Sequence, residues 1–381
     1  MITTILKDKL KYGISVVERI SNKSLTLPIL NNILLKTEKN FLNLSATDLE
    51  MGIQWWALVK TEKEGKITVP AKLLSSFVSF LPNKPITLKV KGVDLQIECE
   101  NRETTIKGID AEEFPIIPKV SEEEKLNINA GLFCRNLAKV VDIASFSSTK
   151  VEISGVYFSF QKDMVTMTAT DSFRLGEKKM YLKASSTLSK NYSLILPQRT
   201  AKEIINVFAE KEGEMTIYFS PNQVMFETLL SETKHPDIQI ISRLIEGEYP
   251  NYQEIIPKSY ETKVTFKAEE LVGQIKLASL FSGKVNEVKV KADPKKGELL
   301  VFSQDPDTGE HKGSIKVKIE GKACEVSFNH RFLLEGILSV MAGDEKNPEI
   351  TLDLNGSDKA AVLRSKRDGD YLYLIMPIKT N

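Results

Sequence analysis

The apolar positions of this chain show a short β-type run followed by a helix-type pattern, and this combination occurs three times. Short β-type runs open at Ile2, Leu126 and Lys263. Each leads into a stretch, at 7–20, 131–146 and 268–281, in which apolar residues recur every three or four positions. Side chains at that spacing lie on one face of a helix. The pattern therefore predicts three amphipathic helices, whose buried stripes are Leu10, Ile14 and Val17, then Phe133, Leu137, Val140, Val141 and Ala144, then Leu271, Ile275 and Ala278.

Each of these helices has a companion at a nearly constant distance along the chain. Candidate second helices begin at Pro70, Pro197 and Asn329, and each follows three β-type residues. Proline is favourable at the first position of a helix, because its missing N–H has no partner within the helix there. The chain is therefore predicted to contain one structural unit repeated three times.

Runs with a period of two lie between and after the helices, at 41–46, 86–90, 156–160, 164–169 and 299–303. Alternation of this kind marks strands with one buried and one wet face. Each repeat is then two helices on antiparallel sheet, and the predicted fold class is α+β. Breaks near 121–125 and 257–260 give three similar domains at 1–125, 126–258 and 259–381.

Composition narrows the function only a little. The 381 residues are 41% hydrophobic and 27% charged, with a formal net charge of +1, so contact with nucleic acid depends on local placement of charge. No window approaches the roughly 18 apolar residues of a membrane helix. The segment after Met1 lacks a signal-peptide layout, so we expect a cytoplasmic protein. Cys99, Cys134 and Cys324 lie far apart, which predicts buried thiols rather than disulfides or a zinc site.

Sequence signals for catalysis are weak. The three histidines lie in unrelated contexts, and there is no phosphate loop or nucleophile motif, so we expect neither metal, cofactor nor enzymatic activity. Asp48 and Asp171 both follow an Ala-Thr pair and form a conceivable carboxylate pair for acid–base chemistry. Their equivalent places in two repeats favour a structural role, in which a short polar side chain stabilises a turn after a strand.

Basic residues recur on corresponding helices. They are Lys7, Lys11, Arg135, Lys139 and Lys276 on the opening helices, and Lys72, Arg199, Lys202 and Arg331 on the second helices. Taken singly, each is an ordinary solvated residue. Their recurrence suggests a shared surface that contacts phosphates without reading bases.

Several short stretches resemble the β subunit of bacterial DNA polymerase III. They are Thr26–Leu30, Asn32–Leu35, Ala46–Met51, Thr68–Lys72, Glu113–Pro115, Ala169–Leu175, Glu248–Tyr252, Phe328–Asn329 and Tyr373–Pro377. They run in order from one end of the chain to the other, over three repeats of the right size. Each string is weak alone, and together they are specific.

The resemblance implies a DNA sliding clamp, a non-enzymatic processivity factor of DNA replication. In that family two chains join head to tail into a six-domain ring, whose helices line the hole and whose sheets form the outer wall. The implied partners are duplex DNA without regard to sequence, a second copy of the chain, the polymerase III α subunit, the clamp loader and other proteins with clamp-binding motifs. No membrane partner is implied.

The resemblance also assigns residues to three surfaces. The partner-peptide cleft between the second and third domains is expected to include Ile153, Thr170, Ser172, Phe173, Arg174, Leu175, Pro250, Asn329, Phe332, Leu374, Met376, Pro377 and Ile378. Without the resemblance, 374–378 would be interpreted as an ordinary edge strand. Leu280 and Phe281 are expected to pack against Ile106 of the second copy at the dimer seam.

This chain departs from the family pattern at three places. Ser172-Phe173 replaces the common pair of a small residue and histidine, which bears on peptide preference. The loops expected to touch DNA offer Lys23 and Lys150 where other members have arginine, polar and tyrosine residues. Two alternatives remain open: a metal-dependent nuclease, which needs several convergent carboxylates, and a peptide-binding adaptor that never meets DNA. The two-domain trimeric clamps are disfavoured by the three repeats.

Overall fold

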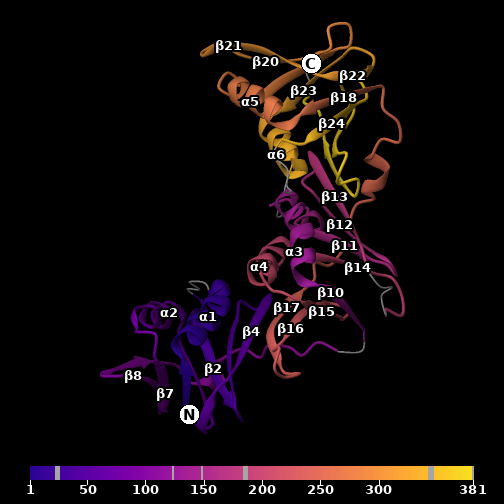
Figure 1. Cartoon of the computed structure of the whole chain (residues 1–381). Coiled ribbons are helices and arrows are strands. Elements are labelled where there is room, and N and C mark those ends of the chain that lie inside the picture. Colours follow the sequence, from indigo (N-terminus) through magenta and orange to yellow (C-terminus); the bar gives the residue numbers. More distant parts are fainter. Residues whose placement is uncertain (22–25, 122–123, 147–148, 183–187, 342–346, 380–381) are drawn as a thin grey trace. The chain divides into compact units, whose positions relative to one another are not determined.

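The computed structural model describes residues 1–21, 26–121, 124–146, 149–182, 188–341 and 347–379 (Figure 1). The chain forms two compact units, and their border passes through the middle repeat. One unit holds Met1–Cys134 with Ser186–Lys190 and Lys202–Leu244, and the other holds Arg135–Ser185, Asn191–Ala201 and Ile245–Asn381. No helix of the described residues is long and apolar enough to cross a membrane.

The three repeats follow one order of elements. The first contains β1 (Ile2–Leu6), α1 (Lys7–Val17), β2 (Asn32–Glu38), β3 (Phe41–Thr47), β4 (Met51–Leu58), β5 (Lys60–Lys63), β6 (Gly65–Pro70), α2 (Ala71–Phe80), β7 (Pro85–Lys91), β8 (Asp94–Cys99) and β9 (Arg102–Lys107). The second contains β10 (Lys125–Asn129), α3 (Ala130–Ala138), β11 (Gly155–Phe160), β12 (Met164–Thr170), β13 (Arg174–Tyr181), β14 (Tyr192–Pro197), α4 (Gln198–Phe208), β15 (Glu214–Phe219), β16 (Gln223–Leu229) and β17 (Pro236–Arg243).

The third repeat contains β18 (Thr262–Lys267), α5 (Ala268–Ser279), β19 (Glu287–Asp293), β20 (Glu298–Asp305), β21 (Gly309–Lys316), β22 (Lys318–Gly321), β23 (Cys324–Asn329), α6 (His330–Met341), β24 (Glu349–Leu354), β25 (Ala361–Ser365) and β26 (Tyr371–Ile375). All strand pairs described are antiparallel, and each repeat carries two helices, so the predicted α+β class is confirmed.

The sheets run across the borders between repeats. Within the first unit, β17 of the second repeat pairs with β4 of the first, giving an eight-stranded sheet in the order β10-β15-β16-β17-β4-β3-β2-β6. Within the second unit, β26 of the third repeat pairs with β13 of the second, giving the order β14-β11-β12-β13-β26-β25-β24-β18-β22. In both places, the last strand of one repeat continues the sheet of the repeat before it.

The predicted helix faces are confirmed, but all three opening helices end before the predicted residue, α5 at Ser279 in place of Phe281. Every residue of the three predicted stripes is buried. However, α1 ends at Val17 and continues as a 3-10 turn over Glu18–Ile20, and α3 ends at Ala138 before a 3-10 turn over Val141–Ile143. Apolar spacing alone overestimates the length, because the tighter turn keeps its side chains on the buried face.

The prolines stand one position before the place predicted for them. Pro70 closes β6 and Pro197 closes β14, and the helices begin at the next residues, Ala71 and Gln198. The backbone of Pro70 is extended, with ψ of 119°, so this residue is the helix N-cap.

Two helical glycines differ in the space around them. A Cβ built on Gly336, in α6, meets ring atoms of Tyr373 in β26 at 2.4 Å and 2.5 Å. A Cβ on Gly273, in α5, meets nothing within 4 Å. The first glycine lets α6 lie close to β26, whereas the second has no packing role in the chain.

We predict opposite effects for alanine at these two positions. Gly336→Ala should lower the free energy of unfolding by about 1–3 kcal/mol, because overpacking outweighs the better helix propensity. Gly273→Ala should raise it by about 0.5–1 kcal/mol, since alanine restricts the unfolded chain without a clash. Urea denaturation of both variants checks this, and equal effects of one sign would contradict the close approach of α6 to β26.

Candidate functional site

The Ala-Thr-Asp segment before β13 forms a tight turn that aims the candidate cleft residues. The Thr170 hydroxyl donates to the carbonyl of Arg174 at 2.7 Å, and Asp171 Oδ1 accepts the N–H groups of Phe173 at 2.9 Å and Arg174 at 3.0 Å. Ser172 at the tip has a φ of 77°, a conformation that favours glycine. The turn leaves Phe173 61% exposed.

The same turn precedes β4 in the first repeat. Thr47 donates to the carbonyl of Met51 at 2.9 Å, Asp48 Oδ1 accepts the N–H of Met51 at 2.8 Å, and Leu49 has a φ of 77°. The structural interpretation of Asp48 and Asp171 is therefore confirmed: both carboxylates bind backbone N–H groups of their own turns.

Arg174 is held by partners from three parts of the second unit. Its Nε donates to Asp171 Oδ2 at 2.9 Å, its Nη2 donates to the carbonyl of Asp142 at 3.3 Å, and it pairs with Glu335 of α6. The guanidinium lies 4.7 Å from the ring centre of Phe332. Sequence reasoning missed Asp142 and Glu335, because only the tertiary fold brings them to the arginine.

An apolar cluster is exposed next to this arginine. The rings of Phe173 and Phe332 stack with centroids 6.3 Å apart. The chain leaving β26 runs alongside, with the Met376 N–H donating to the Phe173 carbonyl at 2.8 Å and the Ile378 N–H to the Ser327 carbonyl at 2.8 Å. Met376 is 37% exposed, and Pro377 and Ile378 are half-buried. The structure therefore brings the middle and the C-terminal end of the chain together here.

Other candidate cleft residues belong to the interior. Leu175, Leu374 and Ile153 are almost fully buried, and Thr170 is buried within its turn. Leu175 and Leu374 pack in a cluster with Tyr252, whose hydroxyl donates to Glu177 at 2.7 Å. Pro250 is exposed on the segment that leads into this cluster, and Asn329 is half-buried, with Oδ1 accepting the Arg331 N–H at 2.9 Å.

The segment 374–378 is not an ordinary edge strand. Its first two residues end β26, which lies between β13 and β25 inside the nine-stranded sheet. Leu374 pairs with Leu175, and Ile375 pairs with Arg174. The residues after it leave the sheet beside Phe173, so this strand end forms part of the candidate cleft.

The candidate DNA-contact cations differ in how they are held. Lys11, Lys72, Arg135, Lys150, Arg199, Lys276 and Arg331 are exposed, and Lys7 and Lys202 are half-buried. Lys7 Nζ lies 3.7 Å from the carboxylate of Asp8. Lys23 lies outside the described residues. Apart from Lys150, which lies in a loop, the exposed members extend from helices that bury apolar residues, as a phosphate-contacting surface requires.

The charge of Lys139 is paired with a carboxylate far away in the sequence. Its Nζ lies 2.6 Å from Asp368 Oδ2 and 5.2 Å from the ring centre of Tyr371. The other oxygen of Asp368 pairs with Lys178 of β13. These three side chains join α3, β13 and the loop before β26, so Lys139 serves the junction of the repeats.

The expected dimer seam is only partly available on the surface. Ile106, in β9, is 2% exposed and pairs across the sheet with Leu95, so in the single chain its side chain packs within its own core. Alternation along β9 turns it toward its own core. Leu280 is 70% exposed, and Phe281 stacks on His311 of β21 with centroids 6.2 Å apart.

The cysteines and acidic residues offer no evident metal centre in the described part of the chain. Cys99 and Cys134 are buried and Cys324 is half-buried, all as free thiols. No group of three or more His, Cys, Asp or Glu side chains is arranged there to hold an ion.

Comparison with known proteins gives one consistent result. Three family models match in succession: the DNA polymerase III beta subunit N-terminal domain over residues 1–118, its central domain over 127–251 and its C-terminal domain over 253–379. The beta sliding clamp of Synechococcus elongatus is 28% identical over 379 residues, which is 98% of each chain.

Solved structures show the same fold. The DNA polymerase sliding clamp of Bacillus subtilis matches with a TM-score of 0.91 and 25% identity over 100% of both chains. A clamp from Pseudomonas aeruginosa bound to griselimycin matches with a TM-score of 0.91 and 21% identity over 100% of both chains. Three repeats, in which the last strand of one pairs with the sheet of the repeat before it, define a clamp-type architecture. The chain belongs to the DNA polymerase III beta subunit family, the beta sliding clamps.

The Asp368 junction generates a prediction about acid stability. Burial alone raises the pKa of Asp368, but the hydrogen bonds from Lys139 and Lys178 outweigh it and hold this pKa below its ordinary value of 3.8. A carboxyl with a depressed pKa contributes stability that is fully present above its unfolded pKa and lost as the pH falls through the folded pKa. The contribution should therefore be complete at neutral pH and should disappear at pH values below 3.8.

Asp368→Asn should lower the free energy of unfolding at pH 7 by about 1–3 kcal/mol, because two lysines lose their partner. It should also flatten the fall in stability on acidification. Urea denaturation at pH values from 7 to below the ordinary pKa measures both effects. Asp163→Asn, a change at an exposed carboxylate, is the matched control. A variant with the same acid dependence as the parent would show that the depressed pKa does not matter for stability.

Proposed function

We propose that this chain is a DNA sliding clamp, in which two copies close head to tail into a ring around duplex DNA. The ring tethers a polymerase and other DNA-metabolism proteins through a peptide cleft on the second and third repeats. The observation that carries the proposal is that clamp-family domains cover nearly the whole chain in sequence order. In this proposal the protein is not an enzyme, uses no cofactor and acts in the cytoplasm.

The strand pairing supports closure by a second copy. The last strands of the second and third repeats, β17 and β26, each pair with the fourth strand of the repeat before them, β4 or β13. By the same rule, β9 of the first repeat needs a partner equivalent to β4, and the equivalent strand in the third repeat is β21. Both β9 and β21 are terminal in the sheets described. Pairing β9 of one copy with β21 of the other satisfies both edges twice and closes the assembly.

The surface beside β21 suits such a contact. Leu280, at the end of α5, and Val285 are 70% and 67% exposed. Phe281 packs against His311 of β21, so these apolar side chains flank the open edge. Leu280 and Phe281 therefore remain the proposed seam residues of the third repeat, and the β9 edge offers its backbone rather than the Ile106 side chain.

A ring also suits the charge of the chain. With a net charge of +1 the protein is a poor electrostatic DNA binder as a whole. Linkage by encirclement needs no tight contact, and scattered exposed cations such as Lys11, Lys72 and Arg199 can touch phosphates without reading sequence.

The first prediction for this function concerns the ring. The protein should have twice the chain mass of 42.8 kDa in solution and should give ring-shaped class averages by negative-stain electron microscopy. Leu280→Asp should shift it toward single chains, because a buried unpaired carboxylate opposes the seam. Mass photometry across a dilution series measures the dimer dissociation constant.

Ile116→Asp is the control, since Ile116 is 92% exposed and lies outside both edge strands. Diluted, dissociated protein is mixed with circular or linear DNA and then concentrated, so that rings close around the DNA. In high salt, protein should stay bound to the circular DNA and should be lost from the linear DNA. If the protein stayed bound to both DNA forms in high salt, or to neither, the proposal that the ring encircles DNA would be overturned. Single chains of unmodified protein at micromolar concentration would favour the peptide-binding adaptor.

The second prediction concerns the peptide cleft, which we place at Phe173, Arg174, Phe332 and Met376. Griselimycin is the probe, because a related clamp has been solved in complex with it. Met376→Asp or Phe173→Ala should weaken its binding by about tenfold or more, as expected for a central apolar contact. Isothermal titration calorimetry measures the affinity. Tyr181→Ala, at the far end of β13 and 58% exposed, should leave it unchanged. Equal affinity of all variants would place the binding site elsewhere.

A further inference from the structure

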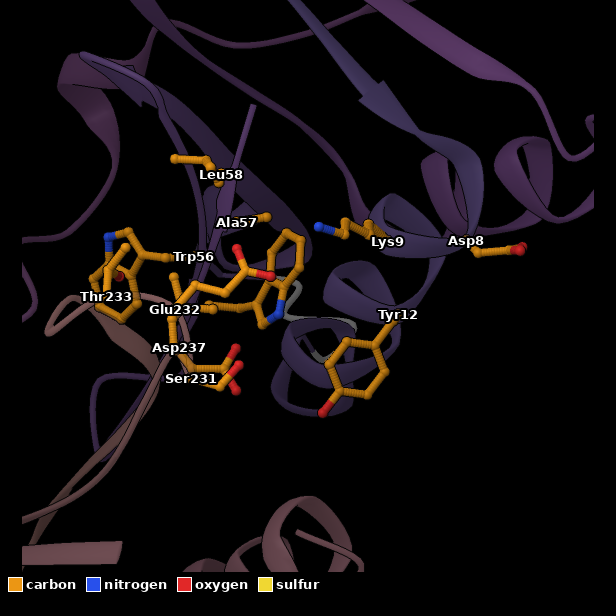
Figure 2. A pocket seen from close by; sticks show the side chains of 12 residues that line it. Asp8, Lys9, Tyr12, Trp56, Ala57, Leu58, Ser231, Glu232, Thr233 and Asp237 are labelled. Carbon is orange, nitrogen blue, oxygen red and sulfur yellow. The ribbon is translucent and has the colours of Figure 1, made fainter. Parts of the chain in front are cut away.

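A cavity lies in the first unit beside α1, the helix that also carries the candidate DNA-contact residues Lys7 and Lys11. It has a volume of about 420 Å³ and lies between α1, the end of β4 and the loop before β17 (Figure 2). Its walls are Asp8, Lys9, Tyr12, Trp55, Trp56, Ala57, Leu58, Leu230, Ser231, Glu232, Thr233 and Asp237.

Aromatic side chains dominate this cavity. Trp55 is 3% exposed, Tyr12 is 41% exposed, and their rings meet edge to face with centroids 6.4 Å apart. Gly13 makes room for the indole, because a Cβ at that position would lie 2.3 Å from Trp55. Trp56, half-buried, meets the His235 ring at 5.9 Å. Aromatic faces beside a hollow suit a large apolar side chain.

Two neighbouring hollows share lining residues with the cavity, and the three follow one another along α1. Lys9 and Leu58 are shared with a hollow of about 430 Å³ that is also lined by Leu6 and Lys60. Tyr12 is shared with a hollow of about 370 Å³, which is also lined by Ser15 of α1, by Arg19 in the 3-10 turn after α1 and by Glu210 after α4. We call these three connected hollows the α1 groove. A linear series of open hollows fits an extended polypeptide better than one compact small molecule.

The equivalent place in the second unit is filled, which sets the α1 groove apart. Trp55 is the fifth residue of β4, and its counterpart in β13 is Lys178. Lys178 pairs with Asp368 from the loop before β26, and Asp368 also binds Lys139, which directly follows α3. In the first unit, the corresponding loop carries Glu232, for which the described residues provide no ion pair. Ion pairs therefore fill the junction of β13 and β26 in the second unit, whereas aromatic rings border a hollow at the junction of β4 and β17 in the first unit.

Charges along the α1 groove are distributed unevenly. In the 430 Å³ hollow the charged wall residues are Lys9 and Lys60, neither paired by a described residue. In the central cavity, Asp237 is bound by Lys211 at 2.7 Å, while Glu232 is exposed. Figure 2 shows the Lys9 amine and the Glu232 carboxylate directed into the space between α1 and the loop. One end of the groove is therefore basic, and the middle carries acidic groups.

From these observations we infer that the α1 groove is a second docking site, which takes an extended segment of a partner protein. A large apolar side chain of that segment lies against Trp55, Trp56 and Tyr12, and a neighbouring acidic residue meets Lys9 and Lys60. Nucleic acid fits less well, because the central cavity carries the carboxylates of Asp8 and Glu232, which oppose a continuous phosphate backbone there.

The groove and the peptide cleft lie at opposite ends of equivalent strands. The cleft is built where β13 begins, at Arg174, and the groove where β4 ends, at Leu58. The docking site itself does not depend on ring closure.

The chain supplies its own reporter for the test, since its two tryptophans, Trp55 and Trp56, both line the cavity. The probe is the tryptophan-free peptide acetyl-Glu-Asp-Ala-Phe-Leu-Gly-Ser-Gly-amide, titrated into the full-length protein. We expect a saturable change in tryptophan fluorescence with a Kd below about 1 mM, the weak end of specific binding. The same peptide with lysines in place of its acidic residues should bind more weakly.

Variants separate this site from others. The double change Lys9→Met with Lys60→Met should weaken the acidic peptide about fivefold to tenfold, as expected for two exposed charge pairs. The matched control, Lys119→Met with Lys162→Met, removes two exposed lysines outside the groove and should have no effect. Met376→Asp, in the peptide cleft, should also leave the fluorescence titration unchanged.

Three results would overturn the inference: no saturable change, equal weakening by the control pair, or a saturable change with oligo-dT in place of the peptide. The mass of the same samples is recorded in parallel. Loss of peptide binding with intact rings counts against the groove alone, whereas absence of rings with peptide binding retained counts against the clamp proposal alone.

Discussion

The structure depends on one constraint, which is that strand edges must find partners. Each repeat ends in a strand that does not close its own sheet but pairs with the repeat before it, through β17–β4 and β26–β13. These backbone hydrogen bonds are independent of side-chain identity, so three diverged repeats keep one mode of connection. The same constraint leaves β9 and β21 at sheet ends in the described chain, which is the reason for proposing that a second copy pairs with them.

The candidate cleft results from this strand pairing between repeats. Because β26 pairs with β13, the chain leaving β26 passes the turn that precedes β13, and Met376 comes to lie beside Phe173. Asp171 shapes that turn through backbone N–H groups and also holds Arg174, whose guanidinium rests on Phe332. The exposed apolar cluster therefore rests on a rigid polar base, which suits a surface that receives a peptide without rearrangement.

Equivalent junctions in the two units have been filled in different ways. Where β26 meets β13, Lys139, Asp368 and Lys178 form a partly buried charge cluster. Where β17 meets β4, Trp55 replaces the lysine and an open cavity remains. Repeats with the same backbone fold thus present different surfaces, because backbone pairing of the strands does not fix the side chains where two repeats meet.

The sequence by itself determined the repeat, the α+β class, the buried helix faces and the structural role of Asp48 and Asp171. These follow from local periodicity and from short-range turn chemistry, which leave marks within a few residues. The tertiary structure alone decided that 374–378 continues an internal strand, that Ile106 faces its own core, that Lys139 is paired and that Glu335 holds Arg174. Those facts depend on which distant segments meet, and neither spacing nor composition along a single stretch of chain records such a meeting.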